Sequence, residues 1–265
     1  MLTLTLLLVI QLAGDFGFTE GPAADAAGNV FFVDDAKSKI YRWDVAEQKL
    51  SVFVENSKHA NGMYFDKNGD LIVCEGETGC VVSYNKAAQR SVIAATFNGK
   101  RFNKPNDLWI APDGAIYFTD PVYGAEYKVV QDGEYVYRIA PDRKTVSVVI
   151  TDLKKPNGIV GTHDGKTLYV NDNGNRKVWR YTISADGSLA DKTLFCNAGY
   201  DGMTLDENGN VYVTDKEIIV YRPSGEEIRR IECPQQPANV CFGGKDRKTL
   251  FITARTGFYC VEPEH

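Results

Sequence analysis

A segment of one design recurs six times along the 265 residues of this chain. Each copy begins at an acidic or amide residue, continues through an apolar run and a glycine turn, and ends in a second apolar run. Successive copies begin 41, 45, 51, 44 and 38 residues apart, which matches the period of a four-stranded propeller blade, roughly 40 to 50 residues. The repeat therefore predicts one closed array of similar units. The equivalent first residues, which we call the anchors, are Glu20, Asn61, Asn106, Asn157, Asp201 and Asn239.

The spacing inside each copy is tighter than the spacing between copies. An acid follows four of the anchors after fourteen residues, and it follows Asn157 after fifteen. Two β-branched or aromatic runs joined by a glycine turn lie between anchor and acid, which is the pattern of a β-hairpin. Anchor and acid are therefore expected at the same end of each hairpin. The acids are Asp34, Glu75, Asp120, Asp172 and Asp215.

The rest of each copy completes a blade. A third strand-like run follows every hairpin and a fourth follows five of them, whereas the sixth copy reaches His265 without a fourth run. The apolar run at residues 2–13 is expected to pair with that last copy and close the ring, because closure removes exposed sheet edges. We predict an all-β, six-bladed β-propeller with four-stranded blades, formed by a single domain over residues 1–265.

The same N-terminal run has a competing interpretation as an export signal. A signal peptide requires a basic first region and a small-residue cleavage site. No Lys or Arg precedes Lys37, and cleavage after Ala13 would leave the sixth blade incomplete. The run is also shorter than the about 20 apolar residues that span a bilayer. We expect a closing strand and a cytoplasmic protein, with a periplasmic or secreted location as the alternative.

Composition indicates a small-molecule partner. Hydrophobic residues make up 43% of the chain, and the net charge of −5 provides no basic surface for nucleic acid. We expect no membrane partner and a monomer or weak homo-oligomer. The six cysteines lack CxxC spacing and lie mostly in strand-like runs, which favours buried free thiols.

The motifs that are absent narrow the chemistry. The chain contains three histidines and no HExxH, GxSxG, Walker A or GxGxxG motif. In a propeller the innermost strands line a central channel, so the anchors are expected to form a ring at one mouth. Two carboxylates and several amide oxygens suit Ca²⁺ or another hard divalent ion. Asn-Gly and Asp-Gly steps also make turns, but six anchors in register favour a site.

Several motifs together resemble one family over nearly the whole chain. They are FTEGP (18–22), GKRFNKPNDL (99–108), YFTDPVYG (117–124), KPNGI (155–159) and YDGM (200–203). They are similar to motifs of the gluconolactonase/regucalcin-like family, also called senescence marker protein 30-like. The resemblance implies a six-bladed propeller lactonase with one catalytic divalent cation, Ca²⁺ first and Zn²⁺, Mg²⁺ or Mn²⁺ as alternatives. It implies metal ligation by Glu20, Asn157 and Asp201, with Asn106 as a fourth position that in some members contacts substrate.

A mechanism follows as a hypothesis. The cation would stabilise the charge that develops on a lactone carbonyl oxygen when water attacks, and a carboxylate would take the proton from that water. Asp201 and Asp120 are the two candidates for this base, since both are expected near the same mouth. Asp120 has the alternative role of an acid that caps a turn at a strand end.

The remaining candidates would contact substrate. Arg101 and Asn103 precede the Pro-Asn-Asp step and are expected to bind substrate hydroxyls, unless they belong to a merely polar loop. Asn106 and Asn61 are assigned to substrate binding as well, Asn61 as a channel-lining residue. Tyr123 lies in a loop expected to line the pocket, and Arg255 ends the sixth hairpin.

Three other functions remain open at the level of sequence. One is phosphotriester hydrolysis on the same metal, which the oxygen ring does not distinguish from lactone hydrolysis. Another is a non-catalytic propeller that binds a ligand or protein, because a fold does not determine a function. The last is a metal-free condensation of the strictosidine synthase type, which the predicted metal cage disfavours.

Overall fold

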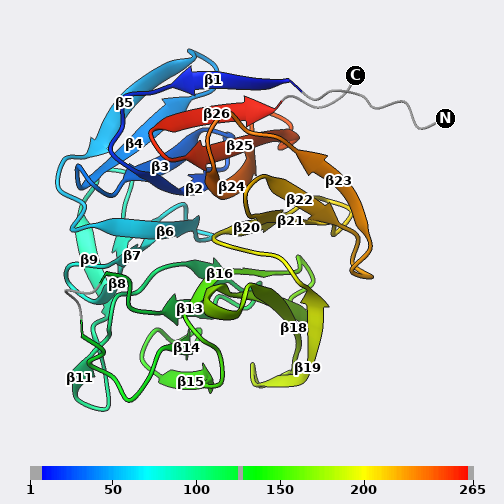
Figure 1. The fold of residues 1–265 in the computed structure, drawn as a ribbon. Coiled ribbons are helices and arrows are strands. Elements are labelled where there is room, and N and C mark those ends of the chain that lie inside the picture. Colours follow the sequence, from blue (N-terminus) through cyan, green and yellow to red (C-terminus); the bar gives the residue numbers. More distant parts are fainter. Residues whose placement is uncertain (1–7, 125–127, 262–265) are drawn as a thin grey trace.

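The computed structural model describes residues 8–124 and 128–261 as six four-stranded antiparallel sheets arranged around a central channel (Figure 1). Within each sheet the strands follow one another in chain order from the channel outward, except in the blade that joins the two ends of the chain. The predicted six-bladed propeller is confirmed.

The first three blades occupy the N-terminal half of the chain. The first contains β2 (Thr19–Ala24), β3 (Val30–Asp34), β4 (Lys39–Asp44) and β5 (Lys49–Val54). The second contains β6 (Ala60–Phe65), β7 (Leu71–Glu75), β8 (Cys80–Tyr84) and β9 (Arg90–Ala94). A small hairpin of β10 (Thr96–Phe97) and β11 (Lys100–Arg101) leads to the third, with β12 (Leu108–Ile110), β13 (Ile116–Asp120), β14 (Tyr135–Ile139) and β15 (Val146–Ile150).

The last three blades follow the same plan. The fourth contains β16 (Pro156–Gly161), β17 (Thr167–Asp172), the short 3₁₀ helix η1 (Asn173–Asn175), β18 (Lys177–Ile183) and β19 (Leu189–Cys196). The fifth contains β20 (Met203–Leu205), β21 (Val211–Thr214), β22 (Ile218–Tyr221) and β23 (Glu227–Ile231). The sixth contains β24 (Pro237–Gly243), β25 (Thr249–Ala254), β26 (Gly257–Val261) and β1 (Val9–Ala13).

The ring is closed by the N-terminal strand, as predicted. Strand β1 pairs antiparallel with β26, with Val9 opposite Val261 and Ile10 opposite Cys260. In Figure 1 the blue β1 lies beside the red β26. Residues 2–7 of the expected closing run lie outside the described residues.

Each inner hairpin has the register expected from the repeat. Thr19 pairs with Asp34, Ala60 with Glu75, and Pro156 with Asp172, so anchor and acid do lie at the same end. The opposite end of each hairpin is a glycine turn. At residues 66–70, Gly69 has a φ of 82° and the Asp66 carboxylate accepts the backbone N–H of Asn68 at 2.9 Å. Segments 66–70 and 206–210 are therefore two of the glycine turns that join the strands of the inner hairpins.

Apolar side chains pack between neighbouring blades and form the core. In one contact Phe32 of the first blade stacks on Phe258 of the sixth, with ring centroids 4.2 Å apart, which ties the two ends of the propeller together. The six cysteines all lie within the described residues and form no disulfide there, and five of them are buried, as predicted. Residues 8–124 and 128–261 contain no helix long and apolar enough to cross a membrane.

Candidate functional site

Irregular pairing in the inner strands surrounds the anchor residues. The register of the inner hairpin shifts between Glu20 and Ala23 in the first blade and between Ala60 and Met63 in the second. The fourth and sixth blades shift at the same place, next to Asn157 and Asn239. A bulge in a strand re-aims the side chain that it carries. The shifts in register therefore change the direction of the anchor side chains relative to the regular alternation of side chains along a strand.

The glycine after an anchor allows neighbouring inner strands to touch. A Cβ atom on Gly21 would lie 1.9 Å from the backbone oxygen of Asn61, and one on Gly202 would lie 2.0 Å from the Asn239 side chain. Gly62 and Gly158 are packed as tightly against the next blade. These Asn-Gly and Asp-Gly steps therefore do not form hairpin turns, and their glycines bring the anchors of adjacent blades close together.

Two carboxyl groups meet in the anchor ring. Glu20 is buried, and burial raises its pKa well above its usual range, with the negative charge of Asp201 raising it further. Burial also raises the pKa of Asp201, and hydrogen bonds from Asn157 and with Glu20 oppose that rise. Two carboxylates held this close repel each other when both are ionised. The pair therefore favours a proton or a cation between its oxygens.

A third acid, Asp107, lies at the same place and was not predicted. It is 7% exposed, burial raises its pKa to about 7, and its charge raises the pKa of both Glu20 and Asp201. Its oxygens accept the backbone N–H of Leu108 at 2.9 Å and of Ile159 at 3.4 Å. The sequence did contain a sign of this acid, because the residue after the anchor is glycine in four blades and aspartate in the third.

The side-chain oxygens of the asparagine anchors differ in whether they already have a hydrogen-bond partner. The side-chain oxygen of Asn106 is buried and has no hydrogen-bond partner within the described residues. The oxygen of Asn239 accepts the backbone N–H of Val240 at 2.8 Å, and the Asn239 side chain also bonds to Glu20 and Asp107. Asn61 is half-buried at the equivalent position of its blade. An unpaired buried acceptor is costly unless a ligand satisfies it, so Asn106 is the amide best suited to a cation.

The residues present fit a hard divalent cation. Two adjacent carboxylates and an unpaired amide oxygen are the donors that such ions prefer. Among residues 8–124 and 128–261, no three His, Cys, Asp or Glu side chains are grouped in a metal-binding arrangement. A cation at this ring would therefore have to take amide oxygens together with the carboxylates.

Asp120 lies at the end of the third inner hairpin and binds backbone groups. Its two oxygens accept the N–H groups of Asn103 and Lys104, both at 2.8 Å, while burial raises its pKa to about 7. Asp34 and Asp172 bind backbone N–H groups of the segment before their own blades in the same way. The structure thus gives Asp120 a recurring structural role, and its role as a base stays a prediction that these bonds disfavour.

The side chains of Arg101 and Asn103 also bind the protein itself. The Arg101 guanidinium donates to the backbone oxygens of Phe102 at 3.1 Å and Glu77 at 3.3 Å. The Asn103 amide donates to the oxygens of Asp120 and Gly133 and accepts the N–H groups of Val130 and Gln131. Both side chains organise loops at this mouth, and substrate contact through them remains a prediction.

Tyr123 approaches the ring from the loop after β13. Its hydroxyl accepts a hydrogen bond of 3.0 Å from the Asn157 amide nitrogen. Burial raises the pKa of this phenol, and so do the negative charges of Asp201 and Glu20. On the opposite side of the ring, Arg255 lies over the Phe18 ring at 5.7 Å and its charge slightly lowers the pKa of Asp201.

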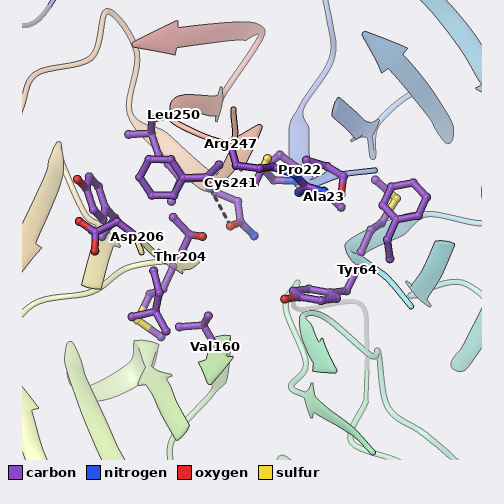
Figure 2. A pocket seen from close by; sticks show the side chains of 18 of the residues that line it. Pro22, Ala23, Tyr64, Val160, Thr204, Asp206, Cys241, Arg247 and Leu250 are labelled. Carbon is purple, nitrogen blue, oxygen red and sulfur yellow. Dashed lines mark hydrogen bonds between the residues drawn. The ribbon is translucent and has the colours of Figure 1, made fainter. Parts of the chain in front are cut away.

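A cavity of about 840 Å³ occupies the other end of the channel, where the hairpin turns lie. Its wall is built by inner-strand residues that follow the anchors, and Figure 2 shows Val160, Thr204 and Cys241 among the side chains around it. Asp107 and Asn239 line this cavity, and the Asn239 side chain also bonds to Glu20 and Asp107 in the anchor ring. The sequence did not predict this cavity.

The chain is similar over most of its length to gluconolactonases and to a diisopropyl-fluorophosphatase. The sequence profile of the SMP-30/gluconolactonase/LRE-like region matches residues 18–256. The chain is 32% identical over 278 residues to the gluconolactonase of Zymomonas mobilis, covering 92% of this chain and 78% of that one. It is 25% identical to the diisopropyl-fluorophosphatase of Loligo vulgaris, covering 93% and 88%. A solved gluconolactonase from Xanthomonas campestris superposes with a TM-score of 0.91 at 25% identity, over 99% of this chain and 93% of that one.

Proposed function

This chain belongs to the SMP-30/gluconolactonase/LRE-like family, and we propose that its anchor ring hydrolyses a sugar lactone of the gluconolactone type. The observation that carries the proposal is the meeting of Glu20 and Asp201 in a ring whose third-blade anchor, Asn106, has a buried side-chain oxygen with no hydrogen-bond partner among the described residues. Lactone hydrolysis needs a group that activates water and a polar site for the carbonyl oxygen, and the carboxylates and amides of this ring are the candidates for both.

The proposed cofactor is one divalent cation, with Ca²⁺ first because all the donors are oxygens. Glu20, Asn106, Asn157 and Asp201 would hold it, since the two acids are adjacent and both amides belong to the same ring. When bound, such an ion acts as a Lewis acid toward a carbonyl oxygen. Zn²⁺, Mg²⁺ and Mn²⁺ are the alternatives that an assay must compare.

Asp201 is the proposed general base. It is half-buried in the ring, and the Asn157 amide and the positive charge of Arg255 both favour its ionised form. The carboxylate would take a proton from the attacking water and later return it to the leaving oxygen. Asp120 is the weaker candidate because both its oxygens are occupied by backbone N–H groups.

Phosphotriester hydrolysis is the second candidate activity. The similarity to the diisopropyl-fluorophosphatase of Loligo vulgaris supports it. The same ring would stabilise charge on a phosphoryl oxygen as well as on a carbonyl oxygen, so the two activities differ in substrate and not in donor set.

A substrate and metal panel tests the proposal. The purified protein would be treated with a chelator and assayed against D-glucono-1,5-lactone, other sugar lactones and diisopropyl fluorophosphate, with each divalent ion added in turn. We expect no lactone hydrolysis without metal and recovery with Ca²⁺; full activity in the chelated protein would refute the metal-dependent mechanism.

Two matched variants locate the base. Asp201→Asn should lower kcat by roughly 10²-fold or more, the usual size of a general-base contribution. Asp120→Asn should retain most of the kcat of the folded enzyme while lowering its thermal stability. The reverse pattern would assign the base to Asp120.

A further inference from the structure

The Tyr123 hydroxyl is a polar group at the ring that the mechanism above does not use. It comes from the loop between β13 and β14, whereas the ring residue that it contacts, Asn157, belongs to the next blade. A side chain that reaches across a blade boundary to a proposed metal ligand lies within reach of whatever that ligand helps to bind.

Contacts with the charged side chains of Lys155 and Glu134 hold the Tyr123 loop in place. The Lys155 ammonium lies 5.1 Å from the centre of the Tyr123 ring, and it also bonds to the backbone oxygen of Val122 and to the Glu134 carboxylate. Glu134 accepts the N–H of Val122 at 2.7 Å. Backbone and ring are therefore both restrained, which limits the positions open to the hydroxyl.

The direction of the hydrogen bond leaves the phenolic hydrogen available. Asn157 is the donor and the Tyr123 oxygen is the acceptor, so the tyrosine's own hydrogen takes no part in this bond. A phenol is both a donor and an acceptor. The phenolic hydrogen can therefore be donated to a group bound in the channel.

Two oxygen atoms of a lactone gain negative charge during hydrolysis. Water adds to the carbonyl carbon and Asp201 takes one of its protons. The bond from that carbon to the ring oxygen then breaks, its electron pair stays on the ring oxygen, and Asp201 returns the proton there. The product carboxylic acid releases a proton to solvent, so one water yields one hydroxyl and one carboxylate. A bound cation would supply charge stabilisation at the carbonyl oxygen, whereas the ring oxygen carries negative charge until the proton from Asp201 arrives and is stabilised by any hydrogen-bond donor beside it.

We propose that the Tyr123 hydroxyl donates a hydrogen bond to the ring oxygen of the bound lactone and stabilises its charge as the ring opens. This inference rests on the proposed lactone hydrolysis. Tyr123 keeps its proton throughout, and its effect grows with the charge on the leaving oxygen. Lactones that leave as an alkoxide therefore depend on Tyr123 more than those that leave as a phenolate, in which the ring delocalises the charge.

The variant Tyr123→Phe removes the hydroxyl and keeps the ring beneath Lys155. Tyr64→Phe is the matched control, because Tyr64 lies in the cavity at the other end of the channel. We expect Tyr123→Phe to lower kcat on D-glucono-1,5-lactone by about 10- to 100-fold, the range of a donor to a developing oxyanion. On 3,4-dihydrocoumarin the loss should be less than about 3-fold, because a delocalised phenolate needs the hydrogen bond less. Calorimetry should give the same Ca²⁺ affinity for both variants and the wild type.

Each other result has a definite meaning. A wild-type kcat for Tyr123→Phe on gluconolactone would overturn the proposal, and so would an equal loss on both lactones. A fall in Ca²⁺ affinity as large as the fall in kcat would show that Tyr123 only positions Asn157, which also overturns it. A wild-type protein that hydrolyses no lactone refutes the proposed function instead, so the two failures are distinguishable.

Discussion

Replacing Asp107 with asparagine should change how the stability of the metal-free protein depends on pH. Asp107 is buried, its pKa lies at about 7 in the folded protein, and an aspartate in the unfolded chain titrates near 3.8. Below about pH 3.8 the carboxyl is protonated in both states and contributes no penalty. Between the two pKa values the unfolded state releases its proton while the folded state keeps it, so stability falls as pH rises and levels off above about pH 7.

The size of the effect follows from the two pKa values. A displacement from 3.8 to about 7 corresponds to about 4 kcal/mol in total, at about 1.4 kcal/mol per pH unit. About 2 to 3 kcal/mol of this should be lost between about pH 5 and pH 8. Asparagine cannot ionise, so this part of the pH dependence should disappear in the variant. Hydrogen bonds from Leu108 at 2.9 Å, from Ile159 at 3.4 Å and from the Asn239 side chain favour the charged carboxylate, but burial outweighs them.

Urea unfolding of chelated wild type and Asp107→Asn at several pH values measures the difference. Below about pH 3.8 the two proteins should have similar stability, because the aspartate is then protonated in both the folded and the unfolded state. At about pH 8 the variant should be the more stable of the two by about 4 kcal/mol, which corresponds to the full displacement of the pKa. Saturating Ca²⁺ should reduce this gap, since a bound cation favours the charged carboxylate. Parallel stability curves for the two chelated proteins would refute the assignment of Asp107 as a buried, uncompensated acid.

Three further predictions concern the framework. Gly202→Ala should lower both the melting temperature and the Ca²⁺ affinity, because its Cβ would lie 2.0 Å from the Asn239 side chain; calorimetry of both quantities checks this. Deleting residues 1–13 should expose the edge of β26 and cause oligomerisation or loss of stability, measured by size-exclusion chromatography and thermal unfolding. Asp120→Asn should cost about 1 to 3 kcal/mol in urea unfolding, because an amide NH2 replaces one of the two oxygens that accept the backbone N–H groups of Asn103 and Lys104; unchanged stability would contradict the capping role.

The architecture was accessible from sequence because it depends on local, repeated patterns. The interval between anchor and acid fits one β-hairpin, and the glycine turns fix the register of that hairpin, as at Gly69. The closing strand followed from the missing fourth run of the sixth blade. These features depend only on the spacing of apolar residues in strands and on the residue types that form turns, and both can be recognised in the sequence alone.

The roles of the hairpin acids were not accessible in this way. Asp34, Asp120 and Asp172 occupy equivalent positions and bind backbone N–H groups of the preceding segment. Glu75 stands in the same register, yet it forms a bidentate pair with Arg90 at 2.8 and 2.7 Å. One extra methylene changes which partner the carboxylate reaches, and the partners lie 15 to 18 residues away in the chain.

The sequence by itself determined a ring of oxygen-bearing anchors on a six-bladed frame. The tertiary structure decided which oxygens remain available to a ligand. It brought Asp107 beside Glu20 and Asp201, left the Asn106 oxygen without a partner in the described residues, and engaged Asn103 fully in loop contacts. The physical reason is that the availability of a polar atom depends on its hydrogen-bond partners, which come from other blades and loops and leave no periodic signal along the chain.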